Sequence, residues 1–442
     1  MTNVIVDLSK YLLILLIAMY TYWNFRYFGV SEEKKKILCR RQNQMMCLLH
    51  ILAYGVMLLK TGDFKLAAFY MVQAVFFQCY RFAYRRLYKN RSEILVNNMC
   101  LLLCVGFIIL ARLSFSKALH QFFLVVLSGT ATLAIPFIIG RAWQLSRIPW
   151  LYGMLGAGLL AAVLMAGDNS YGAQLSLTVK GISLQPTEFV KIIFVFFVSA
   201  MFYRSTDTRQ IGITTVGAAL HVLILAASKD LGSALIFFVT YIFMLFIASS
   251  DWRYLGAGGL LGCLASGAGW VLFSHVRVRV AVWADPWADL DNKGYQITQS
   301  LFSIGTGGWF GMGLYQGMPG KIPVVEKDFI LAAISEEMGA LFAFCILLIC
   351  LGCFIQFMMI ACRMEAMFYK LIAVGLGTMY IVQVFLTAGG ACKFIPSTGV
   401  TLPFVSYGGS SVLSTFILFS VIQGMYILKR SEEEEEAYEA YI

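Results

Sequence analysis

Apolar runs, each long enough to cross a lipid bilayer, recur along almost the whole chain. A membrane-spanning helix needs about 20 predominantly apolar residues. Hydrophobic residues make up 60% of the 442-residue chain and charged residues only 13%, which is too apolar for a soluble fold of this size. We therefore expect an all-α polytopic membrane protein with about 13 transmembrane helices. They are predicted near residues 8–25, 44–60, 64–82, 95–112, 119–140, 147–166, 187–203, 211–227, 231–249, 254–273, 329–359, 368–388 and 409–428.

Basic residues gather in alternate connections between these runs. Connections rich in Lys and Arg usually stay in the cytoplasm, so the pattern predicts an external N-terminus and a cytoplasmic C-terminus. An odd number of helices requires the same arrangement. The net charge of +10 then reflects membrane topology rather than nucleic-acid binding. The basic connections are residues 26–43, 81–91, 141–147, 204–209, 253, 363–370 and 429–430.

The eleven cysteines and four histidines do not form a metal-binding pattern. Most of the cysteines lie inside apolar runs, and no Cys-x-x-Cys pair or Cys/His spacing suggests a metal site, although Cys350 and Cys353 are one helical turn apart. We expect packing roles for the thiols and no resident metal site. A divalent cation is the one cofactor that the sequence leaves possible.

Three predicted external connections are longer than a simple turn: 167–186, 274–328 and 389–408. The second is far longer than a usual connection, and connections of that length are usually functional or disordered. Its tryptophans and tyrosine argue against disorder, because disordered segments are poor in aromatic residues. We expect a large ordered external loop over 274–328.

Charged residues at the predicted outer ends of helices are candidates for a functional site, because such groups are costly in a membrane. Glu188 and Lys191 are three residues apart and so lie on one helix face. One interpretation is an ion pair that fixes the helix end, and the other is an electrostatic site at the membrane boundary. Asp230 beside Lys229 is a weaker signal of the same kind.

The long loop carries Arg277 and Arg279, then Gln296 and Gln299, then a glycine-rich stretch over 305–313. The glycines do not end in Gly-Lys-Ser/Thr and lie on the wrong side of the membrane for ATP, which excludes a nucleotide-binding phosphate loop. A flexible backbone beside two arginines could still hold a pyrophosphate.

Asp328 opens a predicted helix that also carries Glu336 and Glu337. It is either an N-cap, where the helix dipole favours a carboxylate, or a carboxylate at the water–lipid boundary that accepts a proton. The last connection, 395–411, alternates Pro, Gly and Ser with apolar residues. That composition is typical of a re-entrant loop packed inside the protein.

Five motifs together resemble the SEDS family of shape, elongation, division and sporulation proteins (RodA, FtsW and SpoVE). The resemblance covers roughly residues 95–430, and its motifs occur in family order. They are Gln185-Pro186-Thr187-Glu188, Asp230-Leu231-Gly232-Ser233, Gly294-Tyr295-Gln296 with Gln299-Ser300-Leu301, Asp328-Phe329-Ile330 with Glu336-Glu337-Met338-Gly339, and Pro403-Phe404-Val405-Ser406-Tyr407-Gly408-Gly409-Ser410.

The resemblance implies a ten-helix GT-C-like core that polymerises lipid II into peptidoglycan strands outside the cytoplasmic membrane, with undecaprenyl pyrophosphate leaving. It also implies a class B penicillin-binding protein as partner. The family's essential aspartate corresponds to Asp328, which we expect to be catalytic, and its conserved Glu and Lys to Glu188 and Lys191. The expected substrate-binding residues are Glu188, Lys191, Arg277, Arg279, Gln296, Gln299, Ser406, Tyr407 and Ser410.

Two departures from the family pattern bear on activity. Lys327 flanks Asp328 where the family has threonine, and a neighbouring cation is expected to lower the pKa of Asp328 and weaken it as a base. The family's Arg-Arg-Trp is replaced by residues 172–175, Gly-Ala-Gln-Leu. We expect three domains: an N-terminal transmembrane extension over 1–92, the SEDS core over 93–430 and an acidic cytoplasmic tail over 431–442.

Two other functions remain open from the sequence. One is a lipid II flippase or transporter, which would place ionisable groups near the bilayer midplane rather than at the external helix ends. The other is a catalytically weak scaffold for division or sporulation, which the two departures favour. The sequence does not separate elongation from division or sporulation.

Overall fold

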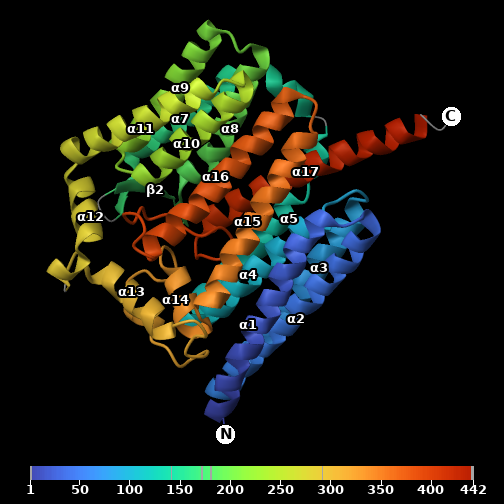
Figure 1. Cartoon of the computed structure of the whole chain (residues 1–442), viewed down its shortest axis with the longest axis vertical. Helices are drawn as coiled ribbons and strands as arrows, with labels where there is room; N and C mark the ends of the chain where they lie inside the picture. The colour runs from blue at the N-terminus through green and yellow to red at the C-terminus, as the bar shows by residue number, and fades with distance from the viewer. Residues whose placement is uncertain (1, 141, 171–172, 180–181, 291, 440–442) are drawn as a thin grey trace. The chain divides into compact units, whose positions relative to one another are not determined.

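The computed structural model describes residues 2–140, 142–170, 173–179, 182–290 and 292–439 and is built mainly of helices (Figure 1). The chain forms two compact units. One comprises Met1–Thr130, Arg277–Cys353 and Val384–Gly408, and we call it unit 1. The other, unit 2, comprises Ala131–Val276, Phe354–Gln383 and Gly409–Ile442.

Twelve helices in the described part of the chain are long and apolar enough to cross a membrane. The predicted helix over 64–82 is present as α3 (Phe64–Leu87) but is not among the twelve. Its 24 residues would span about 36 Å, so length alone does not exclude it. The twelve are α1 (Thr2–Arg26), α2 (Glu32–Thr61), α4 (Glu93–Leu113), α5 with α6 (Phe115–Thr132, Ile135–Ile139), α7 (Pro149–Ala166), α8 (Pro186–Arg204), α9 (Thr208–Ala227), α10 (Leu231–Ser249), α11 (Trp252–Leu272), α15 (Ala340–Arg363), α16 (Met367–Ala391) and α17 (Gly409–Glu439).

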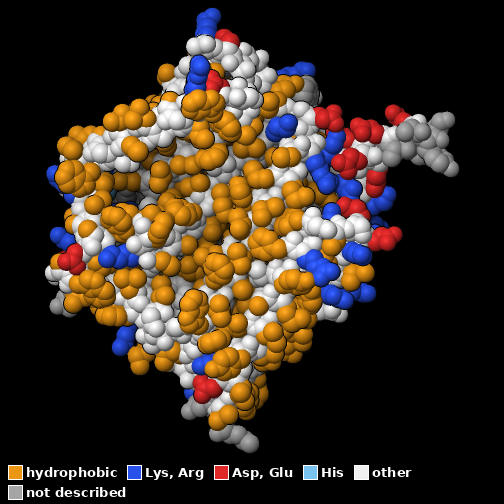
Figure 2. Space-filling model, viewed as in Figure 1, with side chains coloured by type: hydrophobic (Ala, Val, Ile, Leu, Met, Phe, Trp, Pro, Cys, Tyr) orange, Lys and Arg blue, Asp and Glu red, His pale blue; other side chains and the backbone are white. Residues whose placement is uncertain are grey.

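The surface seen in Figure 2 is covered largely by hydrophobic side chains, and most of its charged side chains lie toward the margins. Large apolar residues on the outer faces of α1, α5 and α11 are among those exposed, for example Leu15, Phe123 and Leu264. Such a surface would be costly in water and is suited to contact with lipid.

The basic segment 26–43 was predicted to be a connection, and this prediction was wrong. Only a short 3₁₀ turn (η1, Tyr27–Gly29) and two further residues separate α1 from α2, which begins at Glu32. Ser31 occupies the N-cap position, and Glu32 and Glu33 in the first turn complement the positive end of the helix dipole. The lysines and arginines that follow therefore lie on a helix.

Helix α4 is enclosed inside unit 1. All of its most apolar stretch is buried in the protein. Helices α1, α2, α3 and α14 all contact it, and Asn98 of α4 donates a hydrogen bond of 2.8 Å to Asn24 of α1. The N-terminal helices thus cover a helix that would otherwise face lipid.

The expected ordered loop over 274–328 is mostly helical. It contains α12 (Ser274–Ala284), η3 (Pro286–Asp289), α13 (Tyr295–Gly307) and η4 (Pro319–Lys321). The connection after α7 holds a small antiparallel sheet that the all-α prediction did not include. Its strands are β1 (Asp168–Ser170), β2 (Ala173–Val179) and β3 (Ile182–Leu184), in that spatial order.

The predicted single helix over 329–359 is interrupted, which corrects that prediction. Helix α14 (Ile330–Met338) ends before Gly339, whose φ of +95° ends the helical geometry, and α15 follows. The segment after α13 crosses this break in close backbone contact. Gly311, with φ of +77°, lies so near that an added Cβ would be 2.5 Å from the carbonyl oxygen of Glu337. Close packing against this break therefore requires glycine at position 311.

We expect the substitution Gly311→Ala to destabilise unit 1. Alanine is strained at the positive φ of position 311, which costs roughly 1–3 kcal/mol. The clash of its Cβ with the backbone of the α14–α15 break adds to this cost. Gly305→Ala is the matched control, because no atom lies within 4 Å of its Cβ position and the residue is helical. Thermal denaturation of the purified protein in detergent would compare the two. Equal midpoints would contradict this account of the crossing.

Candidate active site

Asp328 lies in the turn just before α14, in unit 1. The N-cap position belongs to Phe329, and no side chain caps the helix, so the N-cap interpretation of Asp328 is wrong. Among the residues that the structure describes, the Asp328 carboxylate accepts no hydrogen bond and forms no ion pair. A carboxylate that serves no structural contact is free to exchange a proton.

The environment of Asp328 raises its pKa above the ordinary value of 3.8. Burial is the main cause, and the negative charge of Glu326 adds to it, whereas the positive charges of Lys327 and Arg279 act in the opposite direction. The expected influence of Lys327 is therefore present, but burial outweighs it. The prediction of a lowered pKa was wrong, because desolvation of the charged form was not considered.

Arg279 of α12 lies close enough to Asp328 for its positive charge to act on the carboxylate. Its Nη1 donates a hydrogen bond of 3.2 Å to the carbonyl oxygen of Ser397. Two residues further on, Gly399 (φ +74°) comes so close that a Cβ there would be 3.7 Å from Oδ2 of Asp328. Arg277 is exposed, and residues two apart on a helix point in different directions, so the two arginines do not share one site.

The irregular segment 392–408 packs against the turn that carries Asp328. The Ser406 hydroxyl donates to the carbonyl oxygen of Lys327 at 2.5 Å and accepts from the backbone N–H of Leu402 at 2.9 Å. The backbone N–H of Tyr407 donates to the carbonyl oxygen of Glu326 at 2.8 Å. Ser406 is buried, with both hydrogen-bonding functions used inside the protein, so it holds the segment in place rather than presenting a hydroxyl to substrate.

Gln121 of α5 also binds the 392–408 segment, a role that sequence reasoning missed. Its amide nitrogen donates to the carbonyl oxygen of Ser406 at 3.3 Å, and its amide oxygen accepts from the N–H of Gly408 at 3.2 Å. Gln121 is separated from its partners by more than 280 residues in the sequence, so no local pattern could reveal the contact.

The two glutamines of α13 differ in their contacts. Gln296 donates to the carbonyl oxygen of Pro323 at 3.0 Å and so ties α13 to the segment before Asp328. Gln299 is half-buried and makes no hydrogen bond among the described residues. Tyr407 is also half-buried, and its ring lies 6.4 Å from that of His120.

Glu188 and Lys191 form a buried ion pair in the first two turns of α8, in unit 2. Lys191 Nζ lies 2.7 Å from Glu188 Oε1 and 3.1 Å from Oε1 of Gln383 on α16. The hydroxyl of Ser414 on α17 donates to Glu188 Oε2 at 2.9 Å. The structure therefore contains the predicted ion pair, whose contacts join three helices.

The helix ends around this pair gather further polar groups of unit 2. Asp230 caps α10, because its Oδ1 accepts from the N–H of Ser233 at 3.1 Å, while its buried Oδ2 has no hydrogen-bond partner among the described residues. Burial raises the pKa of Asp230, and the charge of Lys191 opposes that shift. The Ser410 hydroxyl accepts a hydrogen bond of 3.0 Å from the backbone N–H of Gln185, which leaves its own proton available.

Within the described residues, no group of three or more His, Cys, Asp and Glu side chains is placed to hold a metal ion. The predicted departure at 172–175 cannot be compared with the site, because Gly172 lies outside the described residues and the side chains of 173–175 are not described.

The family model for FtsW, RodA and SpoVE, described as cell cycle proteins, matches residues 93–431. Peptidoglycan glycosyltransferase RodA of Mycobacterium tuberculosis is 30% identical over 414 residues, covering 86% of this chain and 88% of that protein. This alignment reaches beyond the segment that the family model matches. A probable peptidoglycan glycosyltransferase FtsW of Aeromonas salmonicida is 30% identical and covers 73% of this chain and 86% of its own.

Two solved structures share the fold. One is a chain from a structure titled as the structural coordination of polymerization and crosslinking by a peptidoglycan synthase complex. It has a TM-score of 0.64 and 21% identity, covering 77% of this chain and 98% of that chain. The rod shape determining protein RodA of Thermus thermophilus has a TM-score of 0.57 and 21% identity, covering 76% and 96%. With the family model matching more than half of its residues, this multi-pass membrane protein belongs to the FtsW/RodA/SpoVE family.

Proposed function

We propose that this chain is a peptidoglycan glycosyltransferase that polymerises lipid II into glycan strands at the outer face of the cytoplasmic membrane, for cell shape, division or sporulation. The names of its relatives supply the reaction class. The observation that carries the proposal is the Asp328 carboxylate, which is partly buried and accepts no hydrogen bond from any residue that the structure describes. It stands beside an arginine and a backbone segment that several buried contacts hold in place.

In the proposed reaction, Asp328 accepts the proton of the 4-hydroxyl group of the acceptor GlcNAc. The hydroxyl oxygen forms a bond to the anomeric carbon of the donor as the bond from that carbon to the pyrophosphate oxygen breaks. Undecaprenyl pyrophosphate leaves with the electron pair. Because this leaving group is already good, the protein mainly has to position the sugars, supply the base and offset phosphate charge.

Arg279 is the proposed phosphate-stabilising residue of unit 1. Its guanidinium group forms no ion pair among the described residues and lies on the side of α12 that faces the Ser397 segment. Lys191 is proposed for the same role in unit 2, with Glu188 orienting it. Any divalent cation that takes part is proposed to arrive with the pyrophosphate of the substrate rather than as a resident cofactor.

The proposed partner is a class B penicillin-binding protein that crosslinks the strands. The direct test is polymerisation of labelled lipid II by the purified chain, with and without that partner, followed by separation of the glycan products by length. Strands in either reaction support the proposal. Lipid translocation into vesicles without strand synthesis would favour a flippase. The absence of both translocation and strand synthesis would favour a scaffold.

The proposed orientation places the N-terminus outside the cell and the C-terminus in the cytoplasm. Two contacts of unit 1 support placing the N-terminus on the side of the long loop. Lys10 Nζ donates to the carbonyl oxygen of Gly311 at 3.1 Å, and Gln316 donates to Oδ1 of Asp7 at 3.2 Å. An epitope tag at the N-terminus should be accessible on cells without permeabilisation. Access only after permeabilisation would reverse the assignment.

The pH dependence of polymerisation should report the raised pKa of Asp328. Only the deprotonated carboxylate can accept a proton, so the rate should rise with pH to a plateau. The midpoint of this rise should lie above the ordinary aspartate value of 3.8. Lys327→Gln should move the midpoint to higher pH, because it removes a charge that favours the carboxylate. Lys321→Gln, another lysine of the long loop, is the control and should leave it in place. A midpoint that Lys327→Gln lowers would contradict this electrostatic account.

A further inference from the structure

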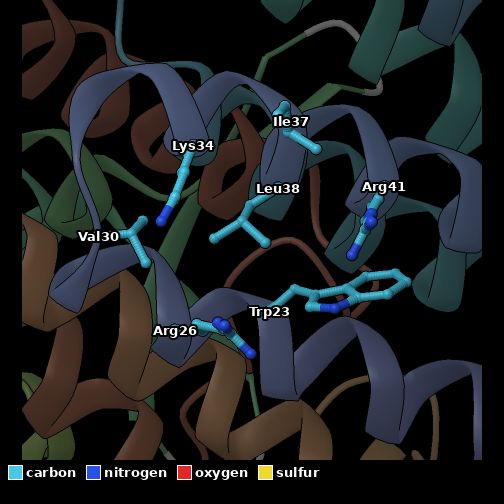
Figure 3. Close-up of a pocket in the computed structure, with 7 residues that line it drawn as sticks. All are labelled: Trp23, Arg26, Val30, Lys34, Ile37, Leu38 and Arg41. Atoms are coloured by element: carbon cyan, nitrogen blue, oxygen red, sulfur yellow. The ribbon is translucent and has the colours of Figure 1, made fainter.

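The hairpin of α1 and α2, at the N-terminal end of unit 1, contains a cavity of about 220 Å³, drawn in Figure 3. This is far more than a single water molecule needs. Trp23 and Arg26 line it from α1, and Lys34, Leu38 and Arg41 line it from α2. Residues three, four and seven apart lie on one helix face, so both helices turn a basic and apolar face to the same space. Lys34 and Arg41 extend from α2 toward α1 (Figure 3).

The three cations of this cavity have no carboxylate partner. Among the described residues, Arg26, Lys34 and Arg41 form no ion pair, whereas the neighbouring Lys35 pairs with Glu32 at 2.8 Å. Arg26 donates a hydrogen bond to the Tyr22 hydroxyl. The guanidinium carbon of Arg41 lies 5.7 Å from the centre of the Trp23 ring, a cation–π contact that helps to hold it over the cavity. Three uncompensated positive charges around one cavity favour an anionic ligand.

The position of the cavity indicates a ligand that belongs to the membrane. It lies where two membrane-spanning helices meet, and the basic segment that includes it follows directly on the end of α1. Ile37 lines the same cavity and is 54% exposed, and large apolar residues such as Leu15 and Leu48 are exposed along the same two helices. A phospholipid can place its phosphate among the cations and its acyl chains along this apolar surface, which a soluble anion cannot do.

We propose that the α1–α2 hairpin binds the headgroup of an anionic phospholipid through Arg26, Lys34 and Arg41. The Trp23 ring forms the wall of the site on α1, and Val30 and Leu38 contact the part of the lipid next to the phosphate. The site is separate from the residues proposed for glycan synthesis, so its failure would leave the proposed function untouched.

The test measures binding of dioleoyl-phosphatidylglycerol to the purified full-length protein by native mass spectrometry, with dioleoyl-phosphatidylcholine as the neutral lipid. The double variant Lys34→Gln, Arg41→Gln should bind the anionic lipid at least about 30-fold more weakly, because each substitution removes a charge-assisted hydrogen bond to the phosphate. Binding of the neutral lipid should not change. Arg26→Gln tests the opposite wall and should weaken binding at least about fivefold, because it too removes a charge-assisted hydrogen bond.

The matched control is Lys36→Gln, Arg40→Gln. It removes the same two charge types from exposed positions of α2 that do not line the cavity. Less than a threefold loss in this control, with intact size-exclusion profiles for all variants, would support the site. Equal losses in the two double variants would mean diffuse attraction and would overturn the proposal. Displacement of the lipid by millimolar glycerol 3-phosphate would instead assign the cavity to a soluble anion.

Discussion

Replacing Asp328 by Asn is expected to lower the rate of lipid II polymerisation by roughly 10²–10⁴-fold, the usual contribution of a general base. The amide has nearly the same shape but cannot accept the proton of the attacking hydroxyl group. Because the Asp328 side chain makes no structural hydrogen bond among the described residues, the fold should tolerate the change. The measurement is the initial rate of strand formation by purified enzyme, together with its thermal denaturation midpoint.

Glu326→Gln is the control for this substitution. Glu326 lies two residues away and pairs with Lys117. Neutralising it removes one carboxylate from the same turn without removing the proposed base, so the rate should stay within a few-fold of the wild type. Wild-type rates from Asp328→Asn, or equal losses in both variants, would remove Asp328 from the mechanism.

Apolar run length predicted most of the helices, because a span needs only enough hydrophobic residues in sequence. Apolar run length did not predict the helix boundaries that are set by charged residues or by backbone geometry. The Lys/Arg-rich start of α2 is predicted to be a connection by its charge, although Ser31 followed by Glu32 and Glu33 is a recognisable helix start. The break at Gly339 was missed, because an apolar run on both sides conceals a residue with positive φ.

The candidate site was predicted only in part, and the missing part depends on contacts between distant segments. Asp328 was found from its charge at a membrane boundary and from the family motif. Its lack of a capping contact and its raised pKa needed coordinates, since both depend on what surrounds it. The sequence analysis did not identify Gln121 or Arg112 as part of the site. Their partners lie more than 200 residues away in the sequence.

Arg112→Leu is expected to destabilise the protein by about 1–3 kcal/mol at neutral pH, the usual cost of leaving a buried hydrogen-bonding group without its partner. Arg112 Nε lies 2.9 Å from Oε1 of Glu337, whose side chain is fully buried. Its Nη2 also donates to the carbonyl oxygen of Gly317 at 3.2 Å, and its guanidinium group lies 4.2 Å from the centre of the Tyr315 ring. Arg112 thus joins α4, α14 and the glycine-rich segment between α13 and α14.

The sign of the pH effect follows from Glu337. Burial raises its pKa from the ordinary 4.5 to about 7, with Arg112 opposing the shift and Glu336 adding to it. A carboxyl group whose pKa is higher in the folded than in the unfolded protein binds its proton more tightly in the folded state. The folded protein therefore loses stability as the pH rises from the unfolded-state pKa to the folded-state pKa. Without Arg112 this pKa rises further, so Arg112→Leu should be less damaging at pH 5 than at pH 8. Thermal denaturation in detergent at both values measures this difference.

Two comparisons separate the buried charge from other effects of the substitution. In the double variant Arg112→Leu, Glu337→Gln the uncompensated charge is gone, so most of the lost stability should return. Lys117→Met breaks the more exposed ion pair with Glu326, where the lysine side chain is 46% exposed, and should cost less than about 1 kcal/mol. If Arg112→Leu costs no more than Lys117→Met, then Glu337 is not charged in the folded protein at neutral pH. In that case the connection between α4 and α14 depends on apolar packing alone.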